Sequence, residues 1–74
     1  MQPREAIGQL LAQLPEALRA ELREATLEAR VERIEQIAQR AVEHSAAAAE
    51  QIRALARRYD YDTLLSALEL PRAS

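Results

Sequence analysis

Apolar residues recur along most of this chain at the three- and four-residue spacing that marks one face of an α-helix. In the first segment this face consists of Ile7, Leu10, Leu11 and Leu14. Pro3 suits a first helical turn, where its missing N–H leaves no partner unsatisfied. Pro15 ends the helix, because the residue before a proline is pushed out of the helical region. The spacing therefore predicts a helix over residues 3–13.

The apolar face changes direction in the next part of the chain. It begins after Pro15 with Leu18, Leu22 and Ala25 and resumes with Val31, Ile34, Ala38 and Ala41. Extending the first part by helical steps leads to the charged Glu32 or Arg33, so a break near residues 27–30 would explain the shift. No glycine or proline enforces this break. The pattern predicts helices over residues 16–28 and 30–43, or one bent helix through both.

Two more helices are predicted in the second half. Ser45 is suited to cap the first of them, over residues 46–58, because its hydroxyl can accept a hydrogen bond from a free backbone N–H. The inward face of this helix comprises Ala48, Ile52, Leu55 and Tyr59. The last predicted helix covers residues 61–69, and residues 71–74 are expected to form a loose tail.

The only aromatic residues, Tyr59 and Tyr61, flank Asp60 between the last two predicted helices. We expect Tyr59 to close the buried face of one helix, Asp60 to cap the next, and Tyr61 to begin its apolar face. Two rings at this structural corner supply contact area that an alanine-rich core lacks. The predicted architecture is a single all-α domain over residues 1–74, a small bundle of four or five short helices.

Composition narrows the classes of partner. The chain has 74 residues, no cysteine and a formal net charge of −2. Its acidic and basic residues are interspersed, so neither nucleic acid nor a membrane surface is an expected partner. No apolar run approaches the roughly 20 residues needed to cross a bilayer, and the N-terminus lacks the features of a signal peptide. The absence of cysteine suits a reducing compartment, and we expect a cytoplasmic location.

Signatures of catalysis are missing from the sequence. It contains no glycine-rich phosphate loop, no cysteine nucleophile and no second histidine for a metal pair or proton relay. We therefore expect no catalytic residue, no cofactor and no metal. Glu16–Arg19 and Glu50–Arg53 have the spacing of ordinary ion pairs along one helix. Arg57-Arg58 could bind an anionic partner, although adjacent arginines on a helix usually face water.

His44 is the residue with the most specific chemical alternative. A neutral imidazole can attack an aspartyl phosphate, as in histidine phosphotransfer domains. In those domains the histidine lies in mid-helix and precedes a lysine-glycine pattern, whereas His44 precedes SAAAAEQIR and lies where a helix is predicted to end. A histidine there interacts favourably with exposed carbonyl groups. Helix capping is the preferred interpretation, and a phosphoacceptor is the less favoured one.

The stretch from LPEALRAELREA through QIRALARRYDYDTLLSALE resembles the short helical segment at the extreme C-terminus of many bacterial hybrid sensor histidine kinases. The most specific part is the ending, with an aromatic-Asp-aromatic corner followed by a Leu-Leu helix. Members often have Gly-Asp where this chain has Ala29-Arg30, and Asp-Pro where it has Ser45-Ala46. The resemblance implies a cytoplasmic accessory domain of two-component signalling, typically following a receiver domain, and transfers no catalytic residue.

These patterns together predict a non-catalytic helical module that binds a protein: a receiver domain, the kinase core or another regulator. Its candidate partner-binding apolar residues are Leu27, Ile37 and Val42. The alternative is self-association, in which a long helix over residues 16–43 pairs with its copy and buries those residues. A third, less favoured hypothesis is a degenerate phosphotransfer domain that uses His44.

Overall fold

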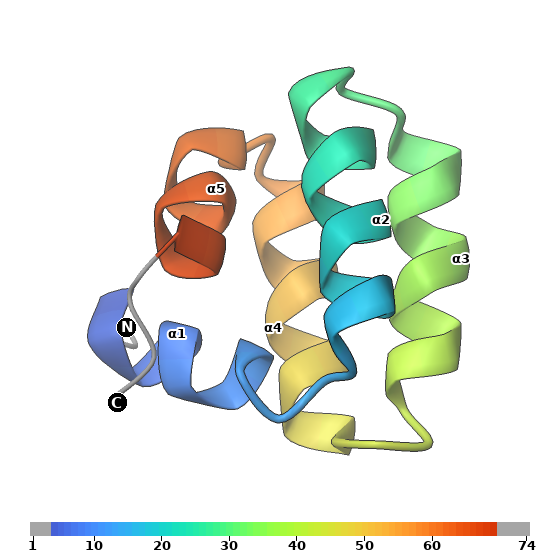
Figure 1. The fold of residues 1–74 in the computed structure, drawn as a ribbon. Coiled ribbons are helices and arrows are strands. Elements are labelled where there is room, and N and C mark those ends of the chain that lie inside the picture. The colour runs from blue at the N-terminus through green and yellow to red at the C-terminus, as the bar shows by residue number, and fades with distance from the viewer. Residues whose placement is uncertain (1–3, 70–74) are drawn as a thin grey trace.

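The computed structural model describes residues 4–69, with side chains from residue 6 onward, and this part of the chain is folded into helices without strands (Figure 1). The five helices are α1 (Arg4–Leu11), α2 (Glu16–Leu27), α3 (Val31–Ala41), α4 (Ala46–Arg57) and α5 (Tyr61–Glu69). The prediction of a small all-α bundle is confirmed, and each helix lies where apolar spacing placed it. The predicted tail and the predicted start at Pro3 lie outside the described residues.

The helices surround one core. α3 packs against α2 and α4 on one side, and α5 packs against the same two helices from the other side (Figure 1). α1 packs against α4 and α5, so the first and last helices of the chain are neighbours. The largest fully buried side chains come from all five helices: Leu11, Leu22, Ile34, Ile37, Ile52 and Leu64.

Small side chains fill the contact between α3 and α4. Ala38 and Ala41 of α3 and Ala48 and Ala49 of α4 are all buried. Alanine side chains let two helix backbones approach closely, and α3 and α4 make the most extensive contact of any helix pair in the described region.

The chain turns between α2 and α3 at Ala29, whose φ of 54° lies in the left-handed region. The Arg30 N–H donates to the Ala25 carbonyl oxygen at 2.9 Å, and the Ala29 N–H donates to the Thr26 carbonyl oxygen at 3.0 Å. This pair of bonds is the Schellman motif, which ends a helix by satisfying its last carbonyl groups. Residues 16–43 therefore form two helices, and the single bent helix is excluded.

α4 ends in the same way, at Tyr59, with a φ of 57°. The Asp60 N–H donates to the Leu55 carbonyl oxygen at 2.9 Å, and the Tyr59 N–H donates to the Ala56 carbonyl oxygen at 3.1 Å. The Asp60 carboxylate then accepts a hydrogen bond from the Thr63 N–H through Oδ1 at 3.4 Å. The predicted capping of α5 by Asp60 is confirmed.

The start of α4 also follows the prediction. The Ser45 hydroxyl oxygen accepts a hydrogen bond from the Ala48 N–H at 3.1 Å, with Ser45 in an extended backbone conformation. This bond satisfies one of the N–H groups that have no partner inside the helix. Ser45 therefore fills the capping position even though Ala46 stands where related segments often have proline.

Candidate partner-binding surface

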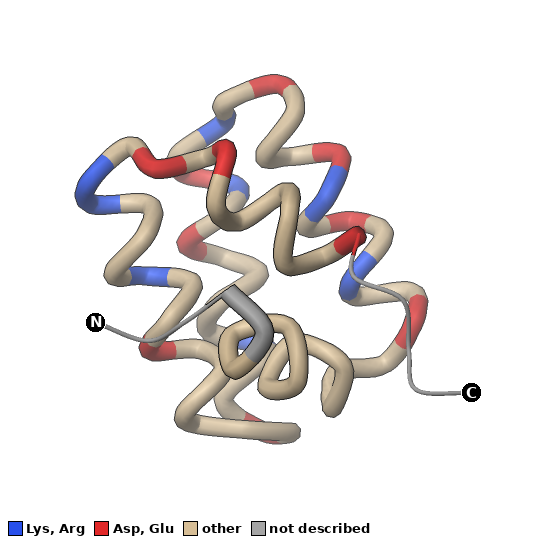
Figure 2. Tube along the Cα trace, turned by 90° about the vertical axis from the view of Figure 1, so that its left-hand side faces the viewer, with Lys and Arg blue, Asp and Glu red and all other residues tan. Residues whose placement is uncertain are grey.

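Charged side chains are distributed unevenly over the molecule. The arginines whose side chains are described lie on α2, α3, α4 and the turns that follow α2 and α4, together with most of the carboxylates (Figure 2). α1 from Ala6 onward carries no charged residue, and α5 carries none between Thr63 and Leu68. We call the surface formed by these two helices the α1–α5 face. Its half-buried residues are Ala6, Leu10, Tyr61, Thr63, Leu65 and Ser66.

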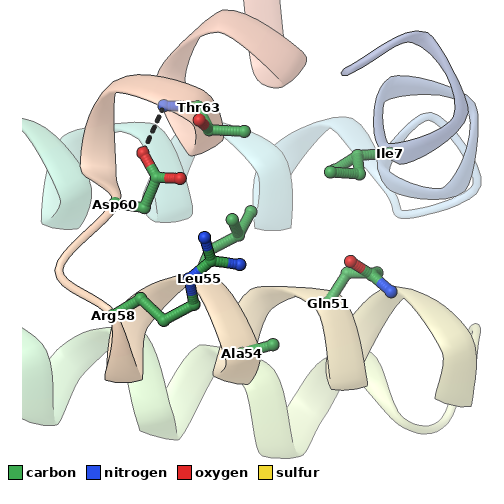
Figure 3. A pocket seen from close by; sticks show the side chains of 7 residues that line it. All are labelled: Ile7, Gln51, Ala54, Leu55, Arg58, Asp60 and Thr63. Atoms are coloured by element: carbon green, nitrogen blue, oxygen red, sulfur yellow. Dashed lines mark hydrogen bonds between the residues drawn. The ribbon is translucent and has the colours of Figure 1, made fainter. Parts of the chain in front are cut away.

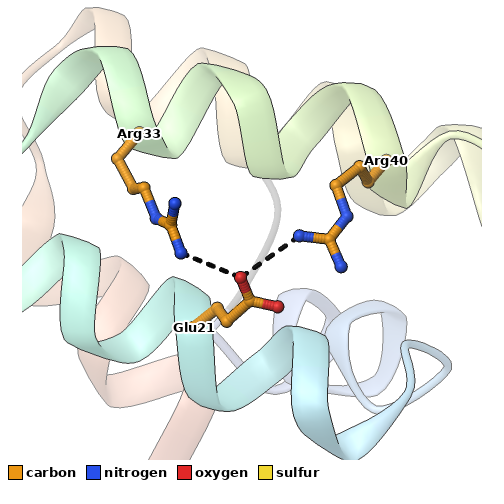
Figure 4. Close-up of polar contacts among 3 residues, drawn as sticks. All are labelled: Glu21, Arg33 and Arg40. Carbon is orange, nitrogen blue, oxygen red and sulfur yellow. Dashed lines mark hydrogen bonds and ion pairs between the residues drawn. The ribbon is translucent and has the colours of Figure 1, made fainter.

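The opposite part of the molecule holds several of its charges in ion pairs. The Glu21 carboxylate on α2 accepts hydrogen bonds through Oε1 from Arg33 Nη2 at 2.9 Å and from Arg40 Nη1 at 3.2 Å, both on α3 (Figure 4). These groups are partly exposed to solvent, where an ion pair contributes at most about 1 kcal/mol. The α2–α3 surface is therefore best explained as a solvated face that supports the fold.

Two of the remaining three ion pairs also join different helices, and the third, Arg30–Glu28, lies within the α2–α3 turn. Arg53 Nε on α4 binds Glu35 Oε1 on α3 at 3.0 Å, and Arg23 Nη2 on α2 binds Glu69 Oε1 on α5 at 3.2 Å. The pairs predicted within single helices, Glu16–Arg19 and Glu50–Arg53, do not form among the described side chains. Helix packing brings Glu35 to Arg53 from a neighbouring element, which spacing along one helix cannot reveal.

A hollow of about 490 Å³ opens between α1, α4 and α5 (Figure 3). Three apolar side chains line it, one from α1 and two from α4: Ile7, Ala54 and Leu55. The polar groups that line it are Gln51, Arg58, Asp60 and Thr63. Apolar walls with a few polar groups are typical of binding sites. This hollow can receive a side chain from another molecule.

The Arg58 side chain extends from the end of α4 into the hollow, toward Leu55 (Figure 3). Its guanidinium makes no ion pair with a described residue, and neither does that of Arg57. The Asp60 carboxylate lines the same hollow, but one of its oxygens already caps α5. The Arg58 guanidinium therefore lies in the hollow without a carboxylate partner among the described side chains.

The tyrosine corner adjoins this hollow. Tyr59 is 73% exposed, so the prediction that it closes the buried face of α4 is wrong. The reason is its left-handed backbone, which takes it off the helical path and turns the ring outward. Tyr61 is half-buried and packs against the core. The two rings meet edge to face, with centroids 6.3 Å apart and planes at 88°.

The predicted apolar surface residues do not form one patch. Leu27, 62% exposed, ends α2 next to the α2–α3 turn. Val42, 44% exposed, follows the last residue of α3 and so lies at the opposite end of that helix. Ile37 is only 1% exposed, so it must be removed from the partner-binding set. It is buried because α3 packs against both α2 and α4, so the buried part of the α3 surface is wider than one apolar face. Val31, assigned to the core by its spacing, is exposed at the α2–α3 turn.

His44 lies in the turn after α3 and its side chain is exposed. Its backbone N–H donates to the Ala41 carbonyl oxygen at 2.9 Å, which helps to close the last turn of the helix. The His44 side chain makes no hydrogen bond with a described residue, so its capping role stays a prediction, and its location differs from the mid-helix position of a phosphotransfer histidine. Within residues 4–69, no three or more acidic or histidine side chains are grouped so as to hold a metal ion.

Sequence reasoning missed the hollow and the role of Arg58 in it. The adjacent arginines were visible, but α1 lies more than 40 residues from the end of α4 in the chain. Only the packing of α1 against α4 and α5 creates the apolar wall beside the guanidinium. The one available signal was the uncharged stretch in each of these helices, residues 6–11 and 63–68, which suits two elements that share a face.

Fold and surface together define a small helical accessory domain. The sequence matches the family model described as the hybrid histidine kinase-response regulator, C-terminal domain, over residues 4–69, and the chain belongs to this family. The family is a domain at the C-terminal end of hybrid kinases and is not itself a catalytic domain. No curated protein and no solved structure matches the chain. None of the described helices is long and apolar enough to cross a membrane.

Proposed function

We propose that this chain is a non-catalytic protein-interaction module of a two-component signalling protein, placed after a receiver domain in the cytoplasm. It binds the receiver domain or the kinase core through the α1–α5 face. Membership of the hybrid kinase C-terminal family supports the signalling context. The observation that supports the binding surface is the uncharged stretch of α1 and α5 on a molecule whose other helices are rich in charge (Figure 2).

The α1–α5 face has the composition and size of an interface. The centres of protein interfaces are depleted in charged residues, whereas ordinary surface is not. A stable interface buries roughly 800 Å² on each partner. The accessible surface of the chain is 4848 Å², so such an interface would cover about a sixth of it. Two adjoining helices of a five-helix bundle supply an area of this order.

The rival hypotheses have less support. Self-association through a long helix over residues 16–43 loses its basis because the chain turns back at Ala29. Phosphotransfer by His44 lacks the mid-helix location that the reaction uses elsewhere. Both rivals remain open to measurement. Sedimentation at increasing concentration should show a monomer, and the chain should accept no phosphate from a phosphorylated receiver domain.

The direct test is a titration followed by NMR. The ¹⁵N-labelled 74-residue chain is mixed with the receiver domain and, separately, with the kinase core of its parent protein. We expect backbone amide signals of α1 and α5 to shift with at least one of them, while the signals of α2 and α3 stay in place. Unchanged spectra with both partners at high concentration would refute the proposed function.

A further inference from the structure

We infer that the hollow between α1, α4 and α5 receives an acidic amphipathic helix of the partner protein, with a carboxylate bound to Arg58. This inference rests on the proposed function and specifies its binding site. It concerns the seven residues that line the hollow and the tyrosine next to them, to which the family match assigns no binding role.

The lining of the hollow requires an apolar group. Ile7, Ala54 and Leu55 present only methyl and methylene groups to it (Figure 3). Transfer of an apolar side chain from water onto such a wall is favourable in proportion to the area covered. The hollow continues into the uncharged α1–α5 face, so a partner element can cover both. The elements on either side of the hollow are helices, so we expect the partner to bind by packing a further helix against them.

The charge balance requires a carboxylate. Five arginines of the described region, at positions 23, 30, 33, 40 and 53, are already held in ion pairs. Arg19 on α2 and Arg57 and Arg58 at the end of α4 make no ion pair with a described side chain, and of these three only Arg58 lines the hollow. Asp60 does not neutralise Arg58, because its carboxylate caps α5 and offsets the positive end of that helix. A guanidinium binds a carboxylate through two parallel N–H donors, which fixes the position of the partner.

The same charges argue against a nucleic acid. A phosphate backbone would bring repeated negative charge to a corner that also carries Asp60 and Asp62. The chain as a whole has a net charge of −2, which gives no long-range attraction for a polyanion. A single helix with one carboxylate placed at Arg58 avoids this repulsion.

Tyr59 supports the location of the contact. It adopts a left-handed backbone, which is unfavourable for a residue with a side chain, and its ring remains largely exposed. The fold therefore gains little from a tyrosine at this position. Tyr59 lies between Arg58 and Asp60, both of which line the hollow, so its ring can cover the edge of a bound helix. Tyrosine and arginine are the residue types that most often dominate binding energy at interfaces.

The test adds two matched pairs of substitutions to the NMR titration. Arg58→Gln and Gln39→Glu each change the net charge by the same amount, but Gln39 lies exposed on α3, away from the hollow. Ala54→Trp fills the hollow, whereas Ala17→Trp places the same ring on the exposed side of α2. Circular dichroism and thermal unfolding establish that each variant is folded.

We expect Arg58→Gln to weaken binding about tenfold or more, as loss of a buried interfacial charge pair does, while Gln39→Glu leaves the affinity unchanged. Ala54→Trp should remove the shifts, and Ala17→Trp should retain them. On the partner, the shifted signals should belong to a helix that carries a glutamate or aspartate, and its replacement by the amide should cause the same loss as Arg58→Gln.

Each contrary result has a distinct meaning. If the partner binds but both arms of a pair behave alike, the hollow is not the site and the proposed function stands. If the shifts map to α2 and α3, the hollow is not the site and the α1–α5 face of the proposed function is wrong as well. If a non-helical or uncharged segment of the partner is shifted, the assigned chemistry of the occupant is wrong. If neither the receiver domain nor the kinase core binds the unsubstituted chain, both the inference and the proposed function are refuted.

Discussion

The backbone N–H of Arg30 reaches over Ala29 to the carbonyl oxygen of Ala25, 2.9 Å away, and this bond reverses the chain between α2 and α3. The reversal depends on a left-handed residue, and that residue is an alanine. For an L-residue with a Cβ atom this conformation is unfavourable by roughly 1 kcal/mol, whereas glycine adopts it without strain. The turn therefore forms because the surrounding contacts of α2 and α3 outweigh the strain at one residue.

Replacing Ala29 with glycine should stabilise the protein. Removal of the strain is expected to raise the free energy of unfolding by up to about 1 kcal/mol, which corresponds to a rise of about 4–8 °C in Tm for a domain of this size. Thermal unfolding followed by circular dichroism measures the shift.

The matched control for this change is Ala20→Gly, at an exposed position inside α2. Glycine in a helix interior lowers stability by about 1 kcal/mol, so the two substitutions should have opposite signs. If Ala29→Gly were as harmful as Ala20→Gly, residue 29 would be helical in solution and the turn described here would be wrong.

The two tyrosines should differ sharply in their contribution to stability. Tyr61 packs against the core, so Tyr61→Ala should lower the free energy of unfolding by about 2 kcal/mol. Tyr59 is exposed and contributes mainly its edge-to-face contact with Tyr61, so Tyr59→Ala should lower it by about 1 kcal/mol or less. Urea denaturation of both variants tests this. Equal losses would mean that the Tyr59 ring is buried in solution.

Helix positions could be read from the sequence because the information is local. Apolar spacing, Ser45 and Asp60 each act within a few residues of the helix they define, and the structure agrees with them. The resemblance to the C-terminal segment of hybrid kinases was also detectable, because the Tyr59–Tyr61 corner is a contiguous motif.

The residues that were misassigned depend on packing between elements that are distant in sequence. Ile37 was assigned to the surface because a single apolar face was taken to be the whole buried part of α3. In the structure α3 packs against both α2 and α4, so residues beside that face are buried as well. Tyr59 was assigned to the core because helical spacing was continued past Arg57, where the helix stops. The hollow beside Arg58 requires α1 to meet α4, and no pattern along the chain encodes that contact.

The revised position of Ile37 can be checked by removing a single methyl group. Ile37→Val should lower the free energy of unfolding by about 0.5–1.5 kcal/mol, because it leaves a small void in the core. Val42→Ala removes more carbon atoms but from an exposed site, so it should change stability by less than about 0.5 kcal/mol. Chemical denaturation distinguishes them, and a larger effect at Val42 would return Ile37 to the candidate surface.

The fork formed by the Glu21 carboxylate with Arg33 and Arg40 joins α2 to α3, which the core already holds together. It should therefore contribute little to the free energy of unfolding. Glu21→Gln is expected to lower the free energy of unfolding by about 1 kcal/mol or less, and the loss should shrink as salt screens the pairs. Glu24→Gln makes the same change in charge on α2 at an exposed carboxylate that has no ion pair among the described residues, and should have almost no effect. Denaturation of both variants at low and high salt measures the difference. A loss of several kcal/mol at Glu21 that persists in high salt would mean that the fork is desolvated and belongs to the core of the fold, contrary to the partial exposure of all three side chains.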